Sequence, residues 1–304
     1  MYDLIIIGAG PAGMTAAIYA ARQKIKSVLI TREFGGQMAK KEVAIENYPG
    51  LGIVEAPELI AKFRDHLKLL GAEIMIADAI KLEKTGAGFS LVTEREKLEA
   101  RAVIIATGSS PRMLDIPGEK EFLGRGVGYC VTCDGPLFSK RDVAVVGGGN
   151  SAFEAALFLA KFAKKIYILE RGPAVFADAS NRELVENTGK VEIIANAGIA
   201  RIEGANFVKN IVYQNAAGSE ISLPVEGVFI KAGNQPASSF ASGLVELNGR
   251  NEIKFDCSNC QTKTPGLFVA GDVSEMKFKQ IVVAAGEGAK AAMAAGEYLR
   301  KVKN

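Results

Sequence analysis

The sequence lacks several side chains on which common catalytic and structural sites depend. It has no tryptophan and a single histidine, His66, so a metal site built from several histidines is excluded. His66 falls in an expected amphipathic helix over 57–70 and is interpreted as structural. No run of about 18 apolar residues occurs, so no membrane-spanning helix is expected. The charge balance is 37 − 34 = +3, which gives no reason to expect nucleic acid or an anionic membrane as a partner.

Cysteine is also scarce. The four cysteines fall into two Cys-x-x-Cys pairs, Cys130 with Cys133 and Cys257 with Cys260. A secreted domain held together by disulfides would be shorter and richer in cysteine. The N-terminus has no basic segment followed by the apolar run of a signal peptide. We therefore expect a cytoplasmic protein.

Glycine, by contrast, is abundant. The chain has 33 glycines in 304 residues, whereas an average usage of ~7% would give about 21. The length fits two domains of ~100–200 residues each. The cluster 8–13 follows an apolar run at 4–7 and precedes an expected helix over 14–23 and a strand over 27–30. Strand, glycine turn, helix and strand form the opening unit of a dinucleotide-binding fold.

The same order of elements returns after residue 140. An apolar run over 143–146 leads into a second glycine turn, an expected helix over 153–161 and a strand over 166–169. The G-x-G-x-x-G/A pattern supplies a tight turn, a close approach of the backbone to a pyrophosphate, and a small residue where helix and strand pack. The positions that fit it are Gly8, Gly10 and Gly13 in the first unit, and Gly147, Gly149 and Ala152 in the second. Two such units predict two bound dinucleotides, a flavin and a nicotinamide.

An acidic residue about 20 residues after such a turn binds a ribose. In the second unit Glu170 ends the strand, and its carboxylate would accept hydrogen bonds from both ribose hydroxyls and repel a 2′-phosphate, which favours NADH over NADPH. The neighbouring Arg171 could pair with a phosphate, so NADPH stays open at this point. In the first unit Glu33 is near the expected place but is expected to lie past the end of the strand.

The pair Cys130 and Cys133 is followed directly by Asp134. In a cytoplasmic chain this spacing indicates half a metal site or a redox disulfide. Zinc would need four ligands, of which the second pair would supply two. Asp134 instead suggests proton transfer to and from a thiolate, and a flavin would give a dithiol a two-electron partner. We therefore predict a redox disulfide and no metal site.

The pair Cys257 and Cys260 is less specific. We interpret it as two unpaired thiols in a surface loop, with an auxiliary disulfide as the alternative.

These motifs together resemble those of the low-molecular-weight bacterial thioredoxin reductases. The resemblance covers essentially the whole chain in the family's order, and Cys130-x-x-Cys133-Asp134 between the two glycine turns is its hallmark. The other segments that carry it are Gly35-Gly36-Gln37, Glu46-Asn47-Tyr48-Pro49-Gly50, Ala106-Thr107-Gly108 and Ala270-Gly271-Asp272.

Other stretches are closer to the flavoprotein subunit of alkyl hydroperoxide reductase. They are residues 133–138, 149–151, 169–170, 279–281 and 286–290. That relative carries an additional N-terminal thioredoxin-like domain, whereas this chain begins at the FAD motif. We therefore expect the reductase core, with a separate thioredoxin- or glutaredoxin-like protein as electron acceptor.

The resemblance implies an α/β fold of two Rossmann-like, three-layer dinucleotide-binding domains, the second inserted in the first. A discontinuous FAD-binding domain would comprise residues 1–112 and 241–304. An NAD(P)H-binding domain carrying the redox cysteines would comprise residues 113–240. A rotation of the inserted domain and a homodimer are expected on the same basis.

The resemblance also assigns roles to residues. Cys133 would face the flavin, Cys130 would attack the partner's disulfide, and Asp134 would act as acid and base. Asp272 would meet the flavin ribityl chain and Gln280 the isoalloxazine edge. The predicted FAD-binding residues are Gly8, Gly10, Pro11, Ala12, Gly13, Glu33, Gly36, Gln37, Asn47, Ala106, Thr107, Gly108, Gly271, Asp272, Lys279, Gln280 and Ile281. The predicted NAD-binding residues are Gly147, Gly149, Asn150, Ser151, Ala152, Glu170 and Arg171.

One departure from the family pattern concerns the electron donor. Members specific for NADPH carry a His-Arg-Arg stretch and a further arginine that bind the 2′-phosphate. Here the run is Glu170-Arg171-Gly172-Pro173, with Phe176 near the place of the last arginine. The leading hypothesis is therefore an FAD-dependent thioredoxin reductase that prefers NADH. The alternatives are a ferredoxin-dependent reductase with a vestigial nicotinamide site, a non-enzymatic flavin redox sensor, and a flavin oxidase in which the Cys-x-x-Cys pair is incidental.

Overall fold

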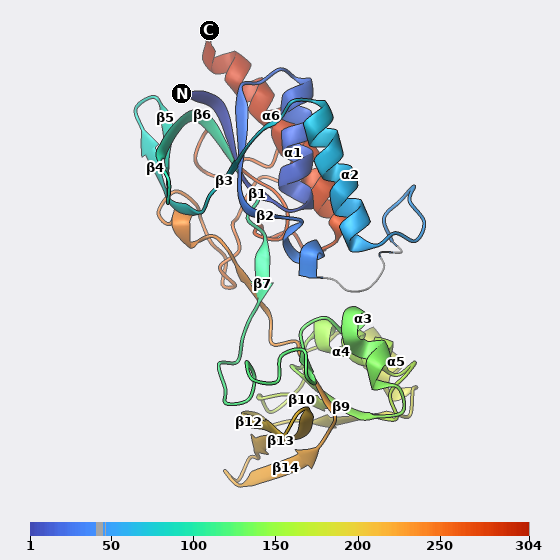
Figure 1. Cartoon of the computed structure of the whole chain (residues 1–304). Helices are drawn as coiled ribbons and strands as arrows, with labels where there is room; N and C mark the ends of the chain where they lie inside the picture. Colours follow the sequence, from blue (N-terminus) through green and yellow to red (C-terminus); the bar gives the residue numbers. More distant parts are fainter. Residues whose placement is uncertain (41–44, 46, 304) are drawn as a thin grey trace. The chain divides into compact units, whose positions relative to one another are not determined.

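The computed structural model describes residues 1–40, 45 and 47–303, without the side chains of Lys40, Thr132, Cys133 and Lys303. The chain divides into two compact units, Met1–Ser110 with Gln235–Asn304, and Pro111–Asn234 (Figure 1). It leaves the first unit along β7 (Ser109–Pro111) and returns along β16 (Asn234–Pro236), two strands that pair with each other. The fold is α/β, as predicted, and each unit is described by itself.

The first unit is built on a seven-stranded sheet with the order β3-β2-β1-β6-β5-β4, in which β17 also pairs with β6. Its strands are β1 (Tyr2–Ala9), β2 (Ser27–Phe34), β3 (Glu73–Ile76), β4 (Ala79–Thr85), β5 (Gly88–Thr93), β6 (Lys97–Ile105) and β17 (Leu267–Val269). Strands β1, β2, β3, β6 and β17 run parallel, and β4 and β5 are antiparallel additions. The carboxyl end of β1 therefore opens onto the first glycine turn.

Three helices lie side by side on one face of this sheet: α1 (Pro11–Arg22), α2 (Ala56–Leu69) and α6 (Ile281–Lys303) (Figure 1). Leu4 and Ile6 of β1 pack against these helices, whereas Ile5 and Ile7 pack on the opposite face with residues of β4 and β5. A strand buried on both faces reads as a continuous apolar run, as residues 4–7 do. Short 3₁₀ turns lie at η1 (Gly36–Lys40) and η3 (Ser239–Ala241).

The second unit has a five-stranded parallel sheet with the order β11-β10-β9-β15-β8. These strands are β8 (Val127–Gly128), β9 (Asp142–Val146), β10 (Lys165–Leu169), β11 (Val191–Ile194) and β15 (Gly227–Ile230). One face is covered by α4 (Asn150–Leu159) and α5 (Ala179–Glu186), preceded by α3 (Val131–Asp134) and η2 (Gly135–Phe138). The other face is covered by an antiparallel meander of β12 (Gly198–Gly204), β13 (Val208–Gln214) and β14 (Glu220–Pro224).

Side chains of β9 alternate between these two faces. Val143 and Val145 pack with Phe153 of α4, whereas Ala144 and Val146 pack with Ile211 of the meander. Each face of the sheet therefore has its own apolar core, and the unit is a three-layer sandwich. The outer layer opposite the helices is made of strands.

Several element boundaries differ from the sequence expectation. Strand β2 continues to Phe34, so the prediction that Glu33 lies past the strand was wrong; Glu33 lies within it and is exposed. The strand expected over 73–82 is two strands, β3 and β4, because the chain leaves the sheet at residues 77 and 78. Helices α1 and α4 begin directly after Gly10 and Gly149, three residues earlier than expected.

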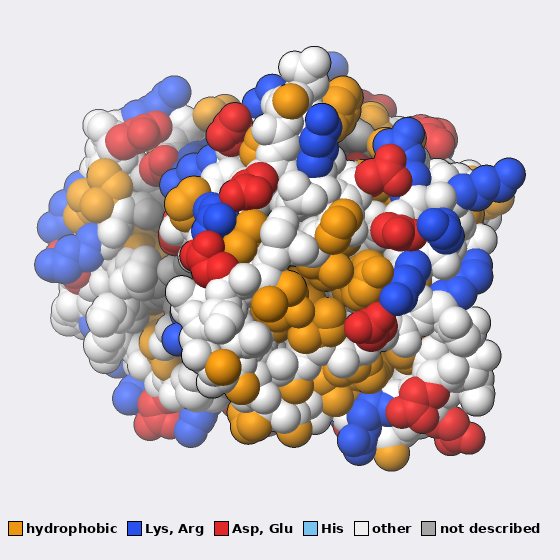
Figure 2. Space-filling view, turned by 90° about the horizontal axis from the view of Figure 1, so that it is seen from below, with side chains coloured by type: hydrophobic (Ala, Val, Ile, Leu, Met, Phe, Trp, Pro, Cys, Tyr) orange, Lys and Arg blue, Asp and Glu red, His pale blue; other side chains and the backbone are white. Residues whose placement is uncertain are grey.

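The surface is mixed in charge. Figure 2 shows acidic and basic side chains interspersed over the face that it draws. Among the described residues, no helix combines the length and the apolar character needed to cross a membrane.

Candidate functional site

The first glycine turn is fixed by backbone contacts that leave no room for side chains. Gly8 has a φ of +103°, and a Cβ there would lie 2.4 Å from the carbonyl oxygen of Ala106. A Cβ on Gly13 would lie 1.6 Å from the carbonyl oxygen of Gly8. These two glycines therefore let β1, β6 and α1 meet closely, which is a structural requirement of the turn.

Gly10 is open where its two neighbours are crowded. It is the N-cap residue of α1, makes no side-chain cap, and has no atom within 4 Å of its Cβ position. Pro11 follows at the first helical position, where its missing N–H costs nothing. The start of this 12-residue helix thus has no side-chain cap and lies beside the open space at Gly10, and an uncapped helix N-terminus is where a phosphate binds.

Residues from distant parts of the chain gather near this turn. Gln37 Nε2 donates hydrogen bonds to the carbonyl oxygen of Ser109 (2.8 Å) and to Oδ2 of Asp272 (3.2 Å). A Cβ on Gly36 would lie 3.4 Å from Cα of Gly10. The structure therefore brings together residues that were predicted separately to bind FAD: Gly10, Gly36 and Gln37 directly around the turn, and Asp272 through Gln37.

A second pair of predicted FAD-binding residues is joined in the same unit. Asn47 Nδ2 donates a hydrogen bond to Oε1 of Gln280 (3.1 Å), although the two residues are 233 positions apart in the sequence. The segment after η1 is thereby tied to the start of α6.

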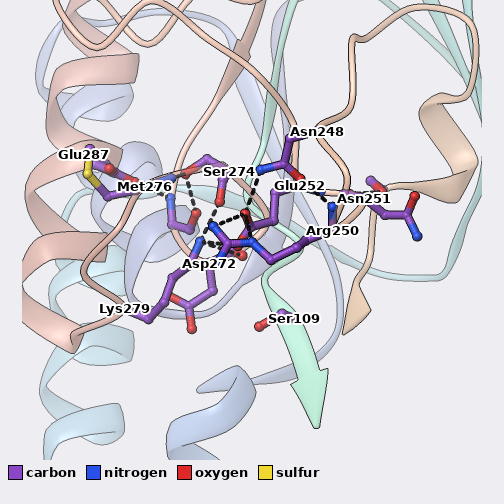
Figure 3. A network of polar contacts seen from close by, with 12 residues as sticks. Ser109, Asn248, Arg250, Asn251, Glu252, Asp272, Ser274, Met276, Lys279 and Glu287 are labelled. Carbon is purple, nitrogen blue, oxygen red and sulfur yellow. Dashed lines mark hydrogen bonds and ion pairs between the residues drawn. The ribbon is translucent and has the colours of Figure 1, made fainter. Parts of the chain in front are cut away.

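Lys279 is held by protein groups. Its ammonium group pairs with Glu252 (Nζ–Oε1 3.2 Å) and donates hydrogen bonds to the carbonyl oxygens of Asp272 (3.3 Å) and Ser274 (Figure 3). Glu252 is 8% exposed, and although burial alone would raise its pKa, Asn248, Lys279 and Arg250 together lower it. In this structure Lys279 therefore fastens the loop that carries Asp272.

Glu287 of α6 lies beneath the same loop. It is 4% exposed, its Oε2 accepts a hydrogen bond from the N–H of Gly271 (2.6 Å), and its buried Oε1 has no partner in the described part of the chain. Burial raises the pKa of Glu287, against the opposing effects of the Gly271 N–H, Lys279 and Lys290. Glu287 was not among the predicted site residues. The sequence feature that could have pointed to Glu287 is that it is the single acidic residue in the apolar and glycine-rich run 281–296.

The remaining predicted FAD residues line the same unit. Thr107 donates a hydrogen bond to the carbonyl oxygen of Ala237 (2.7 Å), so its hydroxyl proton is already used. Ala12 is packed closely by the backbones of Gly271 and Gly288, because a Cβ on either glycine would lie 3.0 Å or less from it. Ile281 is the first residue of α6, and Gly108 has a φ of +69°. Glu46, quoted in the sequence motif, lies outside the described residues.

These features fit a dinucleotide with a flavin. The turn offers uncapped N–H groups and an open Cβ position at Gly10, and Asp272 and Gln280 lie on the segment that leads into α6. Glu33, at the exposed end of β2, is the acidic side chain nearest to the expected ribose position in the sequence.

The second glycine turn, in the other unit, joins β9 to α4. Gly147 has a φ of +129°, and a Cβ there would lie 2.5 Å from the carbonyl oxygen of Lys231. A Cβ on Gly148 would lie 2.5 Å from Oε2 of Glu170. The Glu170 carboxylate therefore stands against the turn, and its Oε1 accepts a hydrogen bond from the N–H of Gly172 (2.6 Å).

Phe176 covers the third position of this turn. A Cβ on Gly149 would lie 2.7 Å from Cε2 of Phe176, and the N–H of Phe176 donates to the carbonyl oxygen of Gly148 (2.9 Å). The Phe176 side chain is nevertheless 73% exposed. The segment 172–178 contains no lysine or arginine, so no side chain within it could pair with a 2′-phosphate. Arg171 precedes it and is exposed.

Asn150 is used within the protein. Its Nδ2 donates to Oδ2 of Asp178 (2.7 Å), and its Oδ1 accepts from the N–H of Asp178 (2.7 Å) and from Asn181 (3.3 Å). Asn150 thus ties the loop before α5 to the start of α4. Ser151 beside it is exposed, and Ala152 is fully buried in the helix core.

Cys130 and Cys133, the predicted redox pair, lie between β8 and η2. Cys130 is half-buried and precedes α3, of which Cys133 is the third residue. The side chain of Cys133 lies outside the described part of the structure, so its pairing with Cys130 stays a prediction. Asp134 is half-buried, and its Oδ2 lies 2.6 Å from the Cβ position of Gly128. The carboxylate therefore lies against β8, two residues before Cys130.

The second cysteine pair is unequal. Cys257 is exposed and Cys260 is fully buried, with both thiols free. The interpretation of two thiols in a surface loop therefore holds only for Cys257. Burial raises the pKa of Cys260 to about 12, and its Sγ lies 3.8 Å from the carbonyl oxygen of Glu287. Cys260 is a core residue and not a nucleophile.

Comparison with known proteins extends over nearly the whole chain. The model of the pyridine nucleotide-disulphide oxidoreductase family matches residues 2–288. The solved structure of thioredoxin reductase from Lactococcus lactis is 36% identical, covers 99% of this chain and 100% of its own, and superposes with a TM-score of 0.80.

Two curated relatives are of similar identity but are longer. A protein named NADH dehydrogenase from Bacillus subtilis is 38% identical over 301 residues, which are 98% of this chain and 58% of the relative. A subunit of alkyl hydroperoxide reductase in Staphylococcus aureus is 37% identical over 98% of this chain and 59% of its own length. The chain thus spans about three fifths of these curated relatives.

Proposed function

The chain belongs to the pyridine nucleotide-disulphide oxidoreductase family and is an oxidoreductase, and from this premise we propose that it is an FAD-dependent thiol-disulfide reductase driven by NADH. Membership implies FAD and a pyridine nucleotide as cofactors. In the proposed net reaction NADH, one proton and one protein disulfide give NAD⁺ and two protein thiols. The proposed acceptor is a thioredoxin- or glutaredoxin-like protein.

The observation that carries the choice of NADH is the pair of side chains at the second glycine turn. Glu170 presents a carboxylate where a ribose is expected, and Phe176 stands near the place of the arginine that NADPH-specific members use to bind the 2′-phosphate. A carboxylate repels a phosphate and accepts hydrogen bonds from hydroxyl groups. The name of the Bacillus subtilis relative, NADH dehydrogenase, supports the same choice.

We further propose a division of labour between the two units. The FAD site lies in residues 1–112 and 241–304, around Gly10, Gln37 and Asp272. The nicotinamide site and the cysteine pair lie in residues 113–240. The active form is a homodimer, which size-exclusion chromatography with light scattering tests directly.

The residues of the chain have distinct tasks in this reaction. Bound FAD would supply a two-electron carrier between the nicotinamide and the Cys130–Cys133 disulfide. Once the pair is reduced, the Cys130 thiolate attacks one sulfur of the partner's disulfide, and the second partner sulfur leaves as a thiol after taking a proton. Asp134, the residue after Cys133, would exchange that proton. Cys133 then attacks Cys130 and releases the second partner thiol.

Anaerobic stopped-flow mixing of the flavin-loaded protein with NADH or with NADPH tests the proposal. NADH is expected to bleach the flavin absorbance at lower concentration than NADPH. A thioredoxin- or glutaredoxin-like protein carrying a disulfide should then restore it. Equal or faster reduction by NADPH would remove the argument from Glu170, and bleaching without transfer to any disulfide would favour a flavin oxidase or a redox sensor.

Phe176 also favours a second candidate, a ferredoxin-dependent reductase with a vestigial nucleotide site. Its ring occupies the space beside Gly149 into which a pyrophosphate would have to fit. In that case neither nicotinamide would bleach the flavin, whereas reduced ferredoxin would. The intact glycines and Glu170 support the NADH-dependent function instead.

A further inference from the structure

Two hydrogen bonds hold Tyr129, the residue directly before Cys130. Its hydroxyl group donates a hydrogen bond to Oε1 of Glu119 (2.6 Å), and its carbonyl oxygen accepts one from Nζ of Lys231 (2.7 Å). The two preceding residues, Val127 and Gly128, pair with β15 as strand β8. The backbone that enters Cys130 is therefore held by strand pairing and by two hydrogen bonds, although the strand directly before it has only two residues.

Glu119 anchors the side chain of Tyr129 in the interior of the unit. It is 1% exposed and accepts the N–H groups of Leu114 (3.0 Å) and Asp115 (2.7 Å) in addition to the Tyr129 hydroxyl. These three donors satisfy the oxygens of the buried Glu119 carboxyl group. Burial and the bond to Glu119 both raise the pKa of Tyr129, so its hydroxyl remains a donor throughout the neutral range.

Lys231 joins this segment to the second glycine turn. It directly follows β15, its N–H donates to the carbonyl oxygen of Val146 (2.8 Å), and its own carbonyl oxygen lies 2.5 Å from the Cβ position of Gly147. Its half-buried side chain runs to the Tyr129 carbonyl. The backbone of Lys231 therefore contacts the second glycine turn, and its ammonium group contacts the segment that leads into Cys130.

We propose that Lys231, Tyr129 and Glu119 form a brace that positions Cys130, and that the Lys231 ammonium group stabilises the Cys130 thiolate. This inference rests on the proposed role of Cys130 as the nucleophile. Covalent geometry limits the separation of Lys231 Nζ and Cys130 Sγ to about 8 Å. The ammonium group is hydrogen-bonded to the Tyr129 carbonyl oxygen, and only the peptide bond and the Cα and Cβ atoms of Cys130 lie between that oxygen and the sulfur. A positive charge at that range in a half-buried site lowers a thiol pKa by about one unit.

The other ionisable groups on the neighbouring elements act in different directions. Asp134 of α3 lies against Gly128 and opposes the thiolate, and the negative charge of Glu119 is separated from Cys130 by the Tyr129 side chain. Cys133 shares α3 with Asp134, and Glu154 on α4 is exposed. Lys231 brings a positive charge to the carbonyl group next to Cys130. Removing that charge should therefore raise the pKa of Cys130.

The experiment measures the pH dependence of alkylation of Cys130 in the flavin-loaded protein after reduction with dithiothreitol, read by peptide mass spectrometry. Lys231→Met removes charge and donor, Lys231→Gln keeps a donor without charge, and Lys231→Arg keeps both. We expect the Cys130 pKa to rise by about one unit in the Met and Gln variants and to return to the original value in the Arg variant. Lys209→Met, at an exposed lysine of β13, serves as the matched control and should change nothing.

Two results would overturn the inference: an unchanged profile in Lys231→Gln, or a Lys231→Arg variant whose Cys130 pKa rises as much as that of Lys231→Gln. Tyr129→Phe tests the brace separately and should slow disulfide turnover without moving the pKa by as much. The outcomes remain distinct from those of the proposed function. If the Cys130 pKa shifts in the Lys231 variants but NADH does not reduce the flavin, the brace is supported and NADH is not the electron donor. If NADH supports normal turnover but the Cys130 pKa does not shift, the proposed function is supported and the brace is not.

Discussion

The carboxylate of Glu170 lies directly against Gly148, with Oε2 2.5 Å from the position that a Cβ on this glycine would take. The middle glycine of the second turn therefore leaves the space that the carboxylate of the acid 22 residues later occupies. Glu170 is in turn oriented by the N–H of Gly172. Gly148 and Glu170 form one structural unit at the place where a ribose is expected.

Gly148→Ala should weaken NADH binding while leaving the fold intact. The added methyl group pushes the Glu170 carboxylate away, and its hydrogen bonds to the ribose hydroxyls are lost. We expect the KM for NADH to rise on the order of tenfold, equivalent to about 1.4 kcal/mol. Steady-state kinetics measure this, and an unchanged KM would mean that Glu170 does not bind the ribose.

The double variant Glu170→Ser with Phe176→Arg should shift the donor from NADH towards NADPH. It removes the repelling carboxylate and adds a guanidinium group at position 176, near the place of the arginine that binds the 2′-phosphate in NADPH-specific members of the family. A charged hydrogen bond of this kind should change the ratio of kcat/KM values by about tenfold to a hundredfold. Phe207→Arg, at another exposed phenylalanine of the same unit, is the control and should leave the ratio unchanged.

Cys133→Ser should separate the two halves of the reaction. Reduction of the flavin by NADH should remain, because in the proposed reaction this step precedes the one that uses the cysteines, whereas turnover of a disulfide substrate should be abolished. Cys257→Ser, at the exposed free cysteine, is the matched control and should keep full turnover. Disulfide turnover that persists in the Cys133 variant would assign the Cys-x-x-Cys pair a different role.

Two glycines of the first turn should respond differently to alanine. At Gly10 the φ is −72° and the Cβ position is open, so Gly10→Ala should change the unfolding free energy of the flavin-free protein by no more than about 0.5 kcal/mol. The methyl group would nevertheless occupy the space of the pyrophosphate and lower FAD affinity on the order of tenfold.

At Gly13 the added Cβ would lie 1.6 Å from the carbonyl oxygen of Gly8, so Gly13→Ala should destabilise the fold itself. Denaturant unfolding and flavin fluorescence distinguish the two effects. The assignment of the pyrophosphate to Gly10 would fail if Gly10→Ala retained FAD with wild-type affinity.

Glu287 should make stability depend on pH. Burial raises its pKa above the unfolded value, opposed by the Gly271 N–H, Lys279 and Lys290 and reinforced by Asp272. The folded state therefore binds the proton more tightly than the unfolded state, and this contribution to stability is complete below the unfolded pKa and is lost as the pH rises through the raised one. Compared with the uncharged Glu287→Gln variant, the wild type should become relatively more stable on acidification. Denaturant midpoints of both proteins at several pH values check the sign, and a constant difference would contradict it.

Local patterns allowed much of the fold and part of the site to be predicted. Apolar runs at 4–7 and 143–146, each followed by glycines, predicted the two strand–turn–helix junctions, because such a turn is built from adjacent residues. The position of Glu170 at the end of β10 followed from the same local order. The meander of β12, β13 and β14 over the second face of the five-stranded sheet was not predicted, because it depends on packing between segments far apart in the sequence.

The amino-acid sequence by itself determined that this chain folds around two dinucleotide-type glycine turns with a Cys-x-x-Cys-Asp motif between them, since each feature lies within a few consecutive residues. Only the tertiary structure decided how side chains with similar sequence signals differ. In it Lys279 pairs with Glu252, and Asn150 is hydrogen-bonded to Asp178. Cys260 is buried whereas Cys257 is exposed. Lys231 reaches the Tyr129 carbonyl group, which is 102 residues earlier in the chain. Such contacts join segments that are brought together only when the sheets assemble, and no local pattern encodes them.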